Sequence, residues 1–441
     1  MRVYSFPRGG LPYEDSTAPS KGQVVNAYLP AISVIPLGEN NRKAYPVVSI
    51  GESVREGMLI GRGSSHADEN IHSSIPGRIV RKVFWKDKDG LENEALVVRM
   101  EGAFDRTGKK EEVLYWNGLS GYDLQRIISE QGIVEMEGIG RPLSEMISKI
   151  RREAEKITLV VRCVFDDPWF AADYALCRDR IKAVIDGANI TAKACIKVSS
   201  IIFAVSHKDK KLGDMLIKES GSLEYSCSLV LTGTRYPQRN NRELELALRI
   251  YEKKEGLSLG SFLILGPAVL AAAYDAVVHK RPILDRYVAV GGSAIKHPQI
   301  MKVKIGTRIG ELIEQCGGFV DVPYRIITGS PLSGKEVMYL DEPVGKTCYA
   351  IAAMSKSQTA IHKEQNCINC GECRTVCPVG LDPQNTYKRI RAMEIDNASS
   401  IGCHGCGCCK IVCPSALPLI ESVSNKNREA ASARSKKCFF S

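Results

Sequence analysis

The first hundred residues alternate apolar and polar positions in short runs, a pattern typical of β-strands. Residues 47–61 (VVSIGESVREGMLIG) place Gly51 and Gly57 where turns are expected. Residues 71–83 then give a short strand, a turn at Pro76 and Gly77, and a further strand. We therefore expect an all-β domain over residues 1–115.

From residue 116 to residue 285 the pattern changes to apolar strands that alternate with helices. The expected strands are residues 157–162, 201–205, 229–231 and 262–265. The expected helices are residues 168–185, 211–219, 241–251 and 267–279. Strands separated by helices form a parallel, doubly wound α/β sheet, which places ligands at the carboxyl ends of its strands.

Two smaller units and a tail follow. Residues 286–355 begin with the strands RYVAVGG and MKVKIGT, and continue with a helix that Thr307 can cap and Gly317 and Gly318 can end. This is an α+β pattern. Residues 356–424 are rich in cysteine and poor in core-forming residues, so metal must supply folding energy for this α domain. Residues 425–441 form a basic tail that we expect to be mobile.

The chain shows no targeting or membrane-spanning pattern. Its N-terminus has no apolar run that could serve as a signal peptide, and its most apolar stretch, residues 261–278, is interrupted by Gly266, Pro267 and Asp275. The net charge of +10 is scattered rather than gathered in one long basic run. We expect a cytoplasmic chain that binds no nucleic acid and has no membrane span of its own.

Cysteine spacing carries the sharpest chemical information. Nine of the sixteen cysteines lie between Cys367 and Cys413, and a chain without a secretion signal keeps its cysteines reduced. Eight of these nine form two copies of C-x2-C-x2-C-x3-C-P, the two-cluster ferredoxin signature, in which the fourth cysteine ligates the other cluster. The crossed assignment puts one [4Fe–4S] cluster on Cys367, Cys370, Cys373 and Cys413, and the second on Cys377, Cys403, Cys406 and Cys409.

Zinc is the alternative metal for these cysteines. A pair of zinc sites would use C-x2-C pairs and would leave the third cysteine and the x3-C-P ending of each motif unexplained. Cys408 breaks neither spacing and is expected to be a bystander.

Two neighbouring clusters relay single electrons, so a two-electron donor would need a flavin in front of them. The candidate flavin and nucleotide loop is GIVEMEGIGRPLSE, residues 132–145. Its glycines Gly132, Gly138 and Gly140 precede an expected helix, an arrangement that can hold a phosphate on backbone N–H groups. Ordinary turns are the alternative interpretation of these glycines.

Along nearly its full length the chain resembles the RnfC family, a subunit of Rnf-type ion-translocating electron-transport complexes. The matching segments, besides both cysteine motifs and the loop at 132–143, are TRYPQ at 234–238, GTRIGELIEQCGG at 306–318 and TGSPLSG at 328–334. The resemblance implies a barrel-sandwich domain like those of lipoyl and biotinyl carriers, a flavoprotein-like α/β domain, a soluble-ligand-binding β-grasp module and a two-cluster ferredoxin domain. The carrier-like loop SSHADEN has no lysine for a swinging arm.

The same resemblance implies a function and a place in the cell. The chain would pass electrons between NADH and the other subunits of a membrane-bound complex that moves an ion, and would lie on the cytoplasmic side through those partners. Two alternatives remain open. One is an electron-transfer protein similar to the cobalamin reductase of diol-utilising microcompartments, and the other is a docking scaffold whose clusters are only structural.

Departures from the family pattern fall at the flavin half. Family glycines are replaced by Glu135 and Glu137, and an aromatic residue by Arg141. A stretch that usually reads NGAECEPYLTAD is here RCVFDDPWFAAD, in which Phe165 and Asp166 replace the first acid and the cysteine. Each loop carboxylate would repel a phosphate about 6 Å away by roughly 3 kcal/mol. We therefore expect weak or absent binding of flavin mononucleotide (FMN) and NADH.

Overall fold

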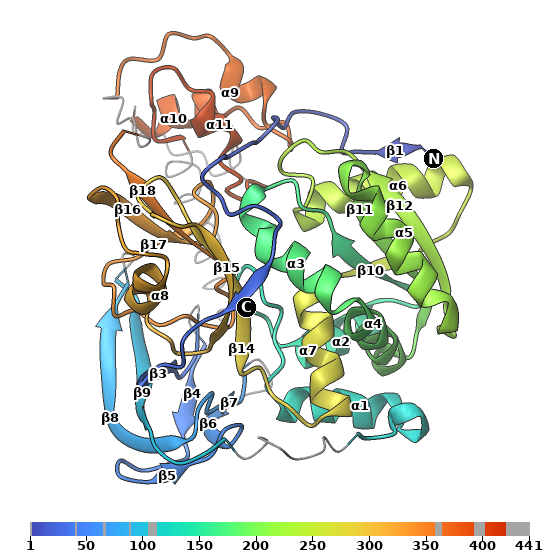
Figure 1. Ribbon diagram of the computed structural model, residues 1–441. Helices are drawn as coiled ribbons and strands as arrows, with labels where there is room; N and C mark the ends of the chain where they lie inside the picture. Colours follow the sequence, from blue (N-terminus) through green and yellow to red (C-terminus); the bar gives the residue numbers. More distant parts are fainter. Residues whose placement is uncertain are drawn as a thin grey trace, which may run out of the picture.

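Along the chain, antiparallel strands come first, then an α/β unit, a mixed sheet and a cysteine-rich segment of short helices (Figure 1). The computed structural model describes residues 2–39, 42–64, 68–87, 90–104, 113–357, 364–391 and 402–419. The strands are β1 (Val3–Tyr4), β2 (Val24–Asn26), β3 (Ile32–Pro36), β4 (Ala44–Pro46), β5 (Ser53–Val54), β6 (Leu59–Gly63), β7 (Ile71–His72), β8 (Gly77–Lys86), β9 (Glu92–Met100), β10 (Ile157–Cys163), β11 (Val198–Ser206), β12 (Ser226–Thr232), β13 (Ser261–Leu265), β14 (Asp285–Gly291), β15 (Gln299–Lys304), β16 (Pro323–Thr328), β17 (Lys335–Glu336) and β18 (Ala350–Ser355). The α-helices are α1 (Gly121–Glu130), α2 (Leu143–Glu153), α3 (Ala171–Asp179), α4 (Ile181–Cys195), α5 (Lys210–Glu219), α6 (Asn241–Glu255), α7 (Pro267–Val278), α8 (Ile309–Gln315), α9 (Glu372–Thr375), α10 (Pro383–Arg391) and α11 (Cys408–Ile411).

A parallel sheet with the order β1-β12-β11-β10-β13 is the centre of the α/β unit. The expected parallel, doubly wound arrangement is confirmed, because helices pack on both faces. Alternate strand residues such as Leu159 and Phe203 pack with α4 and α7, whereas Val160 and Ile202 pack with α6. Because both faces are covered, β10 is buried along its whole length.

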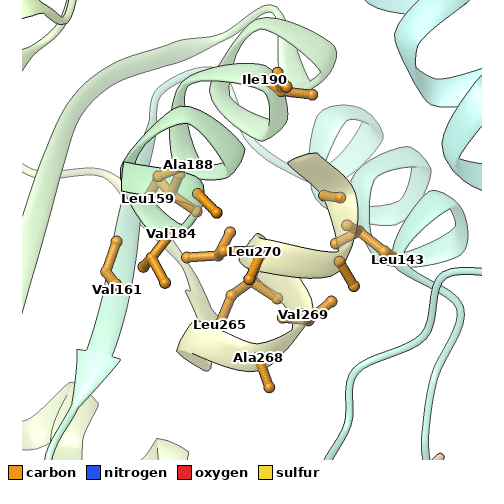
Figure 2. Close-up of a cluster of buried hydrophobic side chains, with 14 of the residues drawn as sticks. Leu143, Leu159, Val161, Val184, Ala188, Ile190, Leu265, Ala268, Val269 and Leu270 are labelled. Atoms are coloured by element: carbon orange, nitrogen blue, oxygen red, sulfur yellow. The ribbon is translucent and has the colours of Figure 1, made fainter. Parts of the chain in front are cut away.

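The larger core cluster lies between this sheet and α4 and α7 (Figure 2). Leu159 and Val161 of β10 face Val184 of α4 and Leu270 of α7 there. The two helices approach closely at Gly187, where any β-carbon would overlap the backbone carbonyl of Leu270. A single glycine therefore sets the spacing of the helix pair.

The single helix expected over residues 168–185 is wrong. A short 3-10 turn (Pro168–Phe170) leads into α3, the chain leaves helical geometry at Arg180 (φ −123°, ψ 36°), and α4 then runs on to Cys195. Arg180 donates to both carboxylate oxygens of Asp275 in α7, at 2.8 and 2.7 Å. This long-range ion pair accompanies the break, and the apolar pattern alone does not indicate it.

The N-terminal residues divide among three units. The antiparallel sheets β3-β9-β8-β5 and β4-β6-β7 enclose a core that includes Ile60 and Ile79, as the alternating pattern predicts. However, β1 pairs with β12 of the α/β sheet, and β2 pairs with β15. The first two strands of the expected β domain over residues 1–115 thus pair with strands of other sheets.

The unit after residue 285 is a mixed sheet, β17-β16-β18-β14-β15-β2, with α8 packed on it. The expected strands are the antiparallel pair β14 and β15. Arg308, not Thr307, is the N-cap of α8, because the Thr307 hydroxyl donates to the Lys304 carbonyl at 2.8 Å. The left-handed glycines Gly317 and Gly318 follow the helix, as the sequence predicts.

The cysteine-rich segment carries the short helices α9, α10 and α11, which Figure 1 shows at the upper left, above β16 and β18. The basic tail at 425–441 lies outside the described residues.

Candidate functional site

The eight motif cysteines line two separate cavities in the cysteine-rich segment. One cavity is lined by Cys377, Cys403, Cys406 and Cys409, together with Cys408. The other is lined by Cys367, Cys370, Cys373 and Cys413. These are the two groups of four that crossed ligation requires. Among the described residues no cluster of His, Cys, Asp or Glu is tight enough for a single metal ion. A four-iron core takes one thiolate per iron, so its ligands surround a space rather than meet at a point.

The two cysteine motifs have the same local geometry. In each, a glycine in the left-handed region precedes a short helix, Gly371 (φ 79°) before α9 and Gly407 (φ 85°) before α11. The third cysteine of each motif lies on that helix. The fourth follows just after the helix, where the Cys377 and Cys413 N–H groups donate to the Arg374 and Lys410 carbonyls at 3.4 and 3.3 Å. Glycine permits this turn without steric cost. The sequences C-G-x-C and C-G-C-C therefore form loops of the same geometry.

The cavity with Cys406 lies beside the carboxyl end of the parallel sheet. The Tyr236 hydroxyl, from the loop after β12, donates to the Cys406 carbonyl at 2.7 Å. Arg242 of α6 donates to the Gly402 carbonyl at 2.9 Å. The Gly10 N–H donates to Val376 at 2.9 Å. The buried Cys408 thiol faces Tyr236 rather than solvent. These contacts dock the cysteine-rich segment on the α/β unit.

A larger cavity of about 390 Å³ lies at the same end of the sheet, where the fold class predicts a ligand. The loop after β10 contributes Asp166, Asp167 and Phe170, and the loop after β12 contributes Tyr236 and Arg239. Residues of the barrel and of the third unit close the other side. Tyr236 thus touches both this cavity and the cysteine-rich segment.

Aromatic rings and one guanidinium form part of the cavity wall. Phe170 stacks on Tyr349 with ring centroids 4.1 Å apart and an interplanar angle of 10°. The Arg239 guanidinium lies 3.9 Å from the Phe170 ring centroid, within the range of a cation–π contact. The Arg239 side chain is thereby fixed against the wall.

Acidic and basic side chains form a buried network, of which Glu137 and Arg239 also line the cavity. Glu137 pairs with Arg239 and, at 2.9 Å, with Arg162. Glu135 pairs with Arg162 at 3.4 Å. Asp173 of α3 pairs with Arg239 at 3.4 Å and extends the network to Arg286 of β14, at 2.9 Å. The side chains of Glu135 and Glu137 are only 12% and 13% exposed, so these pairs are largely shielded from water.

Carboxyl protonation differs within this region. Burial raises the pKa of Glu135 to about 7. Burial also acts on Glu137, but Arg162 and Arg239 outweigh it and hold the pKa of Glu137 below its ordinary value. Burial, reinforced by the neighbouring Asp167, raises the pKa of Asp166 to about 7, and burial raises the pKa of Asp167 to about 6. Glu137 is therefore a carboxylate at neutral pH.

The three glycines of the candidate loop occupy different surroundings. All have left-handed backbone, with φ of 61°, 60° and 67° for Gly132, Gly138 and Gly140. A β-carbon at Gly132 would overlap the carbonyl of Asn70, and one at Gly140 would lie 2.8 Å from Thr347. Gly138 has open space around it and lines the 390 Å³ cavity. Two of the three glycines are thus required by packing between units.

Lys346 holds this loop against the barrel. Its buried ammonium group pairs with Glu69, and donates to the carbonyls of Asn70 at 3.2 Å and Gly132 at 3.0 Å. Sequence reasoning missed Lys346, and it also missed Arg162, Arg239 and Arg286. The available signal was an arginine inside an otherwise apolar strand, ITLVVRC, since a charge there needs a buried partner.

Three family models match successive parts of the chain. They describe an RnfC barrel sandwich hybrid domain at residues 4–103, a Nuo51 FMN-binding domain at 128–253 and an SLBB domain at 287–341. Fold and cysteine motifs together define a multidomain oxidoreductase subunit of mixed α/β architecture.

Curated relatives are similar to the chain over most of its length. The RnfC subunit of the ion-translocating oxidoreductase complex of Rhodobacter capsulatus is 27% identical over 401 residues, which cover 90% of this chain and 77% of the relative. Its equivalent in the proton-translocating ferredoxin:NAD(+) oxidoreductase complex of Clostridium ljungdahlii is 27% identical, with 85% and 82% covered. The equivalent in the Na(+)-translocating complex of Acetobacterium woodii is 24% identical, with 81% and 80% covered. Over most of its length the chain is therefore similar to subunits C of ion-translocating oxidoreductase complexes.

Among solved structures, an NAD+-reducing [NiFe]-hydrogenase in the H2-reduced state gives a TM-score of 0.48 at 11% identity, over 71% of this chain and 61% of that chain. Among the described residues, we find no helix with the length and apolar character needed to cross a bilayer.

Proposed function

We propose that the chain is an electron-transfer subunit of a membrane-bound, ion-translocating Rnf-type oxidoreductase complex, and that it relays single electrons through two [4Fe–4S] clusters. One cluster is held by Cys367, Cys370, Cys373 and Cys413, and the other by Cys377, Cys403, Cys406 and Cys409. The observation that carries the proposal is the division of these cysteines between two adjacent cavities.

The clusters supply one-electron chemistry when bound, and the protein supplies position. The thiolates would hold the iron, and the left-handed Gly371 and Gly407 turn each motif around its cavity. Tyr236, Arg242 and the Gly10 backbone fix the second group of cysteines beside the sheet. A cluster held by that group would therefore be the one beside the α/β unit.

The relatives favour this function over the two alternatives. The names of the three relatives reported above describe subunits of ion-translocating complexes, which argues against a reductase of cobalamin. If the chain were a scaffold with structural clusters, no physiological electron donor would reduce either cluster, and this result would distinguish it from an electron-transfer subunit. We propose that the chain lies on the cytoplasmic side of the membrane and is held there by partner subunits. Firm flotation of the isolated chain with plain phospholipid vesicles would contradict this attachment through partners.

Iron analysis and electron paramagnetic resonance (EPR) test the clusters. Full-length chain purified without oxygen should contain about eight irons and give the signals of two reduced clusters after dithionite. Cys370→Ala should lose one cluster, and the cysteine-rich segment should become protease-sensitive because metal contributes to its folding.

Cys408→Ala is the matched control, since it removes a neighbouring thiol that the spacing does not use. This variant should keep both clusters. Bound zinc without a paramagnetic signal, or loss of a cluster in Cys408→Ala, would show the ligand assignment to be wrong.

A further inference from the structure

We infer that the carboxylates of Glu135 and Glu137 fill the position that a flavin phosphate would need in this chain, so that the clusters are reduced by a one-electron carrier and not by NADH. The inference rests on the proposed function only for the presence of the clusters. The loop concerned, residues 132–142, lies within the region that the Nuo51 FMN-binding domain model matches. The family pattern that the sequence resembles has glycines at these two positions, and the residues present here do not fit the cofactor.

The two carboxylates point at a helix N-terminus. A β-carbon placed on Gly266, the N-cap of α7, would lie 2.7 Å from Glu137 Oε1 and 3.4 Å from Glu135 Oε1. The positive end of a helix with unsatisfied N–H groups attracts anions such as phosphate. Here the chain's own carboxylates approach that end.

Backbone donors of the loop are also occupied. The Glu135 N–H donates to the Arg141 carbonyl at 2.8 Å, and the Gly140 N–H donates to the Glu137 carbonyl at 3.2 Å. Leu143, the first residue of α2, donates to Ile133 at 2.9 Å. The loop is therefore closed on itself, and a phosphate would have to break these hydrogen bonds to be bound by the same groups.

Arginine partners keep the carboxylates in place. Arg162 contacts both Glu135 and Glu137, and Arg239 contacts Glu137. In the family stretch NGAECEPYLTAD the position of Arg162 is an asparagine. Glu135 and Glu137 stand in place of two glycines, and Arg162 stands in place of that asparagine. The three substitutions belong together, because Arg162 pairs with both glutamates in the fold.

This geometry changes the reason for poor flavin binding. The sequence suggests repulsion between a phosphate and two free carboxylates. In the structure both carboxylates are paired with arginines, which reduces their net field. The obstacle is instead occupied space and satisfied donors, and charge repulsion is secondary.

The consequence concerns the electron donor. NADH gives up a hydride, which carries two electrons, whereas each cluster accepts one. Without a flavin to divide the pair, the donor must itself be a one-electron carrier, such as a reduced iron–sulfur protein. Each transfer then oxidises that donor by one electron and reduces one cluster by one electron.

Equilibrium dialysis of the cluster-loaded full-length chain against FMN is the first test. We expect no stoichiometric flavin, no bleaching of cluster absorbance by NADH with or without added FMN, and full bleaching by dithionite. Stoichiometric FMN, or rapid bleaching by NADH, would overturn the inference while leaving the two clusters in place. Missing clusters would instead contradict the proposed function.

Two variants separate filling from repulsion. Glu135→Gly with Glu137→Gly and Arg162→Asn removes the whole set without leaving Arg162 unpaired, and should bind FMN at least about tenfold more tightly than the natural chain. Glu135→Gln with Glu137→Gln keeps the shape and removes the charge, so it should still exclude FMN. Tight FMN binding by the glutamine variant would refute filling of the site. Intact EPR signals of the clusters show that a variant is folded. If the triple variant does not fold, the dialysis of the natural chain against FMN tests the inference alone.

Discussion

Replacing Arg239 by methionine tests the buried charge network directly. The Arg239 side chain is only 4% exposed, and it pairs with Glu137 and Asp173, donates to the Val164 carbonyl at 2.7 Å and packs on Phe170. Removing one partner of a buried ion pair costs about 3–5 kcal/mol, because the remaining charge stays in a poorly solvated place. For a unit of this size that loss lowers the unfolding midpoint by roughly 10 °C.

The effect should depend on pH with a definite sign. In the natural chain the pKa of Glu137 is below its ordinary 4.5, so its ionised form stabilises the fold above that pH, and this stability is lost as the pH falls. Without Arg239, Arg162 and Arg286 alone act against burial, so the pKa of Glu137 rises and its ionised form stabilises the fold less than in the natural chain. The difference in unfolding midpoint between Arg239→Met and the natural chain should therefore be larger at pH 8 than at pH 5.

Thermal unfolding followed by fluorescence measures both quantities, because Trp169 is fully buried in the α/β unit. Arg126→Met is the matched control, since Arg126 is 70% exposed and its contact with Asp123 is 3.9 Å long. An exposed pair of this kind contributes about 0–1 kcal/mol. If at pH 8 the unfolding midpoint of Arg239→Met differs from that of the natural chain by no more than the midpoint of Arg126→Met does, the reasoning is refuted.

Three further changes test neighbouring features, each read from the same unfolding midpoint. Gly132→Ala should be far more destabilising than Gly138→Ala, although both have φ near +60°, because only Gly132 faces a carbonyl, that of Asn70; equal effects would contradict this close approach. Asp166→Asn should stabilise the chain at pH 8 but hardly at pH 4. The pKa of Asp166 is about 7 in the fold against an ordinary 3.8, so ionising this aspartate in the folded chain costs up to about 4 kcal/mol. A stabilisation that does not vary with pH would show another cause. Lys346→Met should cost about 3–5 kcal/mol by leaving the buried Glu69 without its cation, whereas Lys346→Arg should recover part of the loss; equal midpoints for the two variants would argue against the ion pair.

The sequence was sufficient for elements whose pattern repeats locally. Strands β10, β11, β12 and β13 contain the predicted strand segments, because parallel strands buried on both faces give continuous apolar runs. The cysteine spacing likewise gives the two groups of four that line the two cavities, since each motif turns around a glycine of its own.

Features that depend on distant partners were decided only by the tertiary structure. Strands β1 and β2 have two and three residues, too few for a periodic signal, and they are stabilised by pairing with β12 and β15. The helix over 168–185 breaks at Arg180, whose carboxylate partner is Asp275 on another helix. The glutamates of the candidate flavin loop look like unpaired charges in the sequence, because Arg162 and Arg239 lie 27 and 102 positions away from their partners Glu135 and Glu137. Local periodicity contains no information on such pairs, and only the folded sheet brings Arg162 to 3.4 Å from Glu135 and 2.9 Å from Glu137.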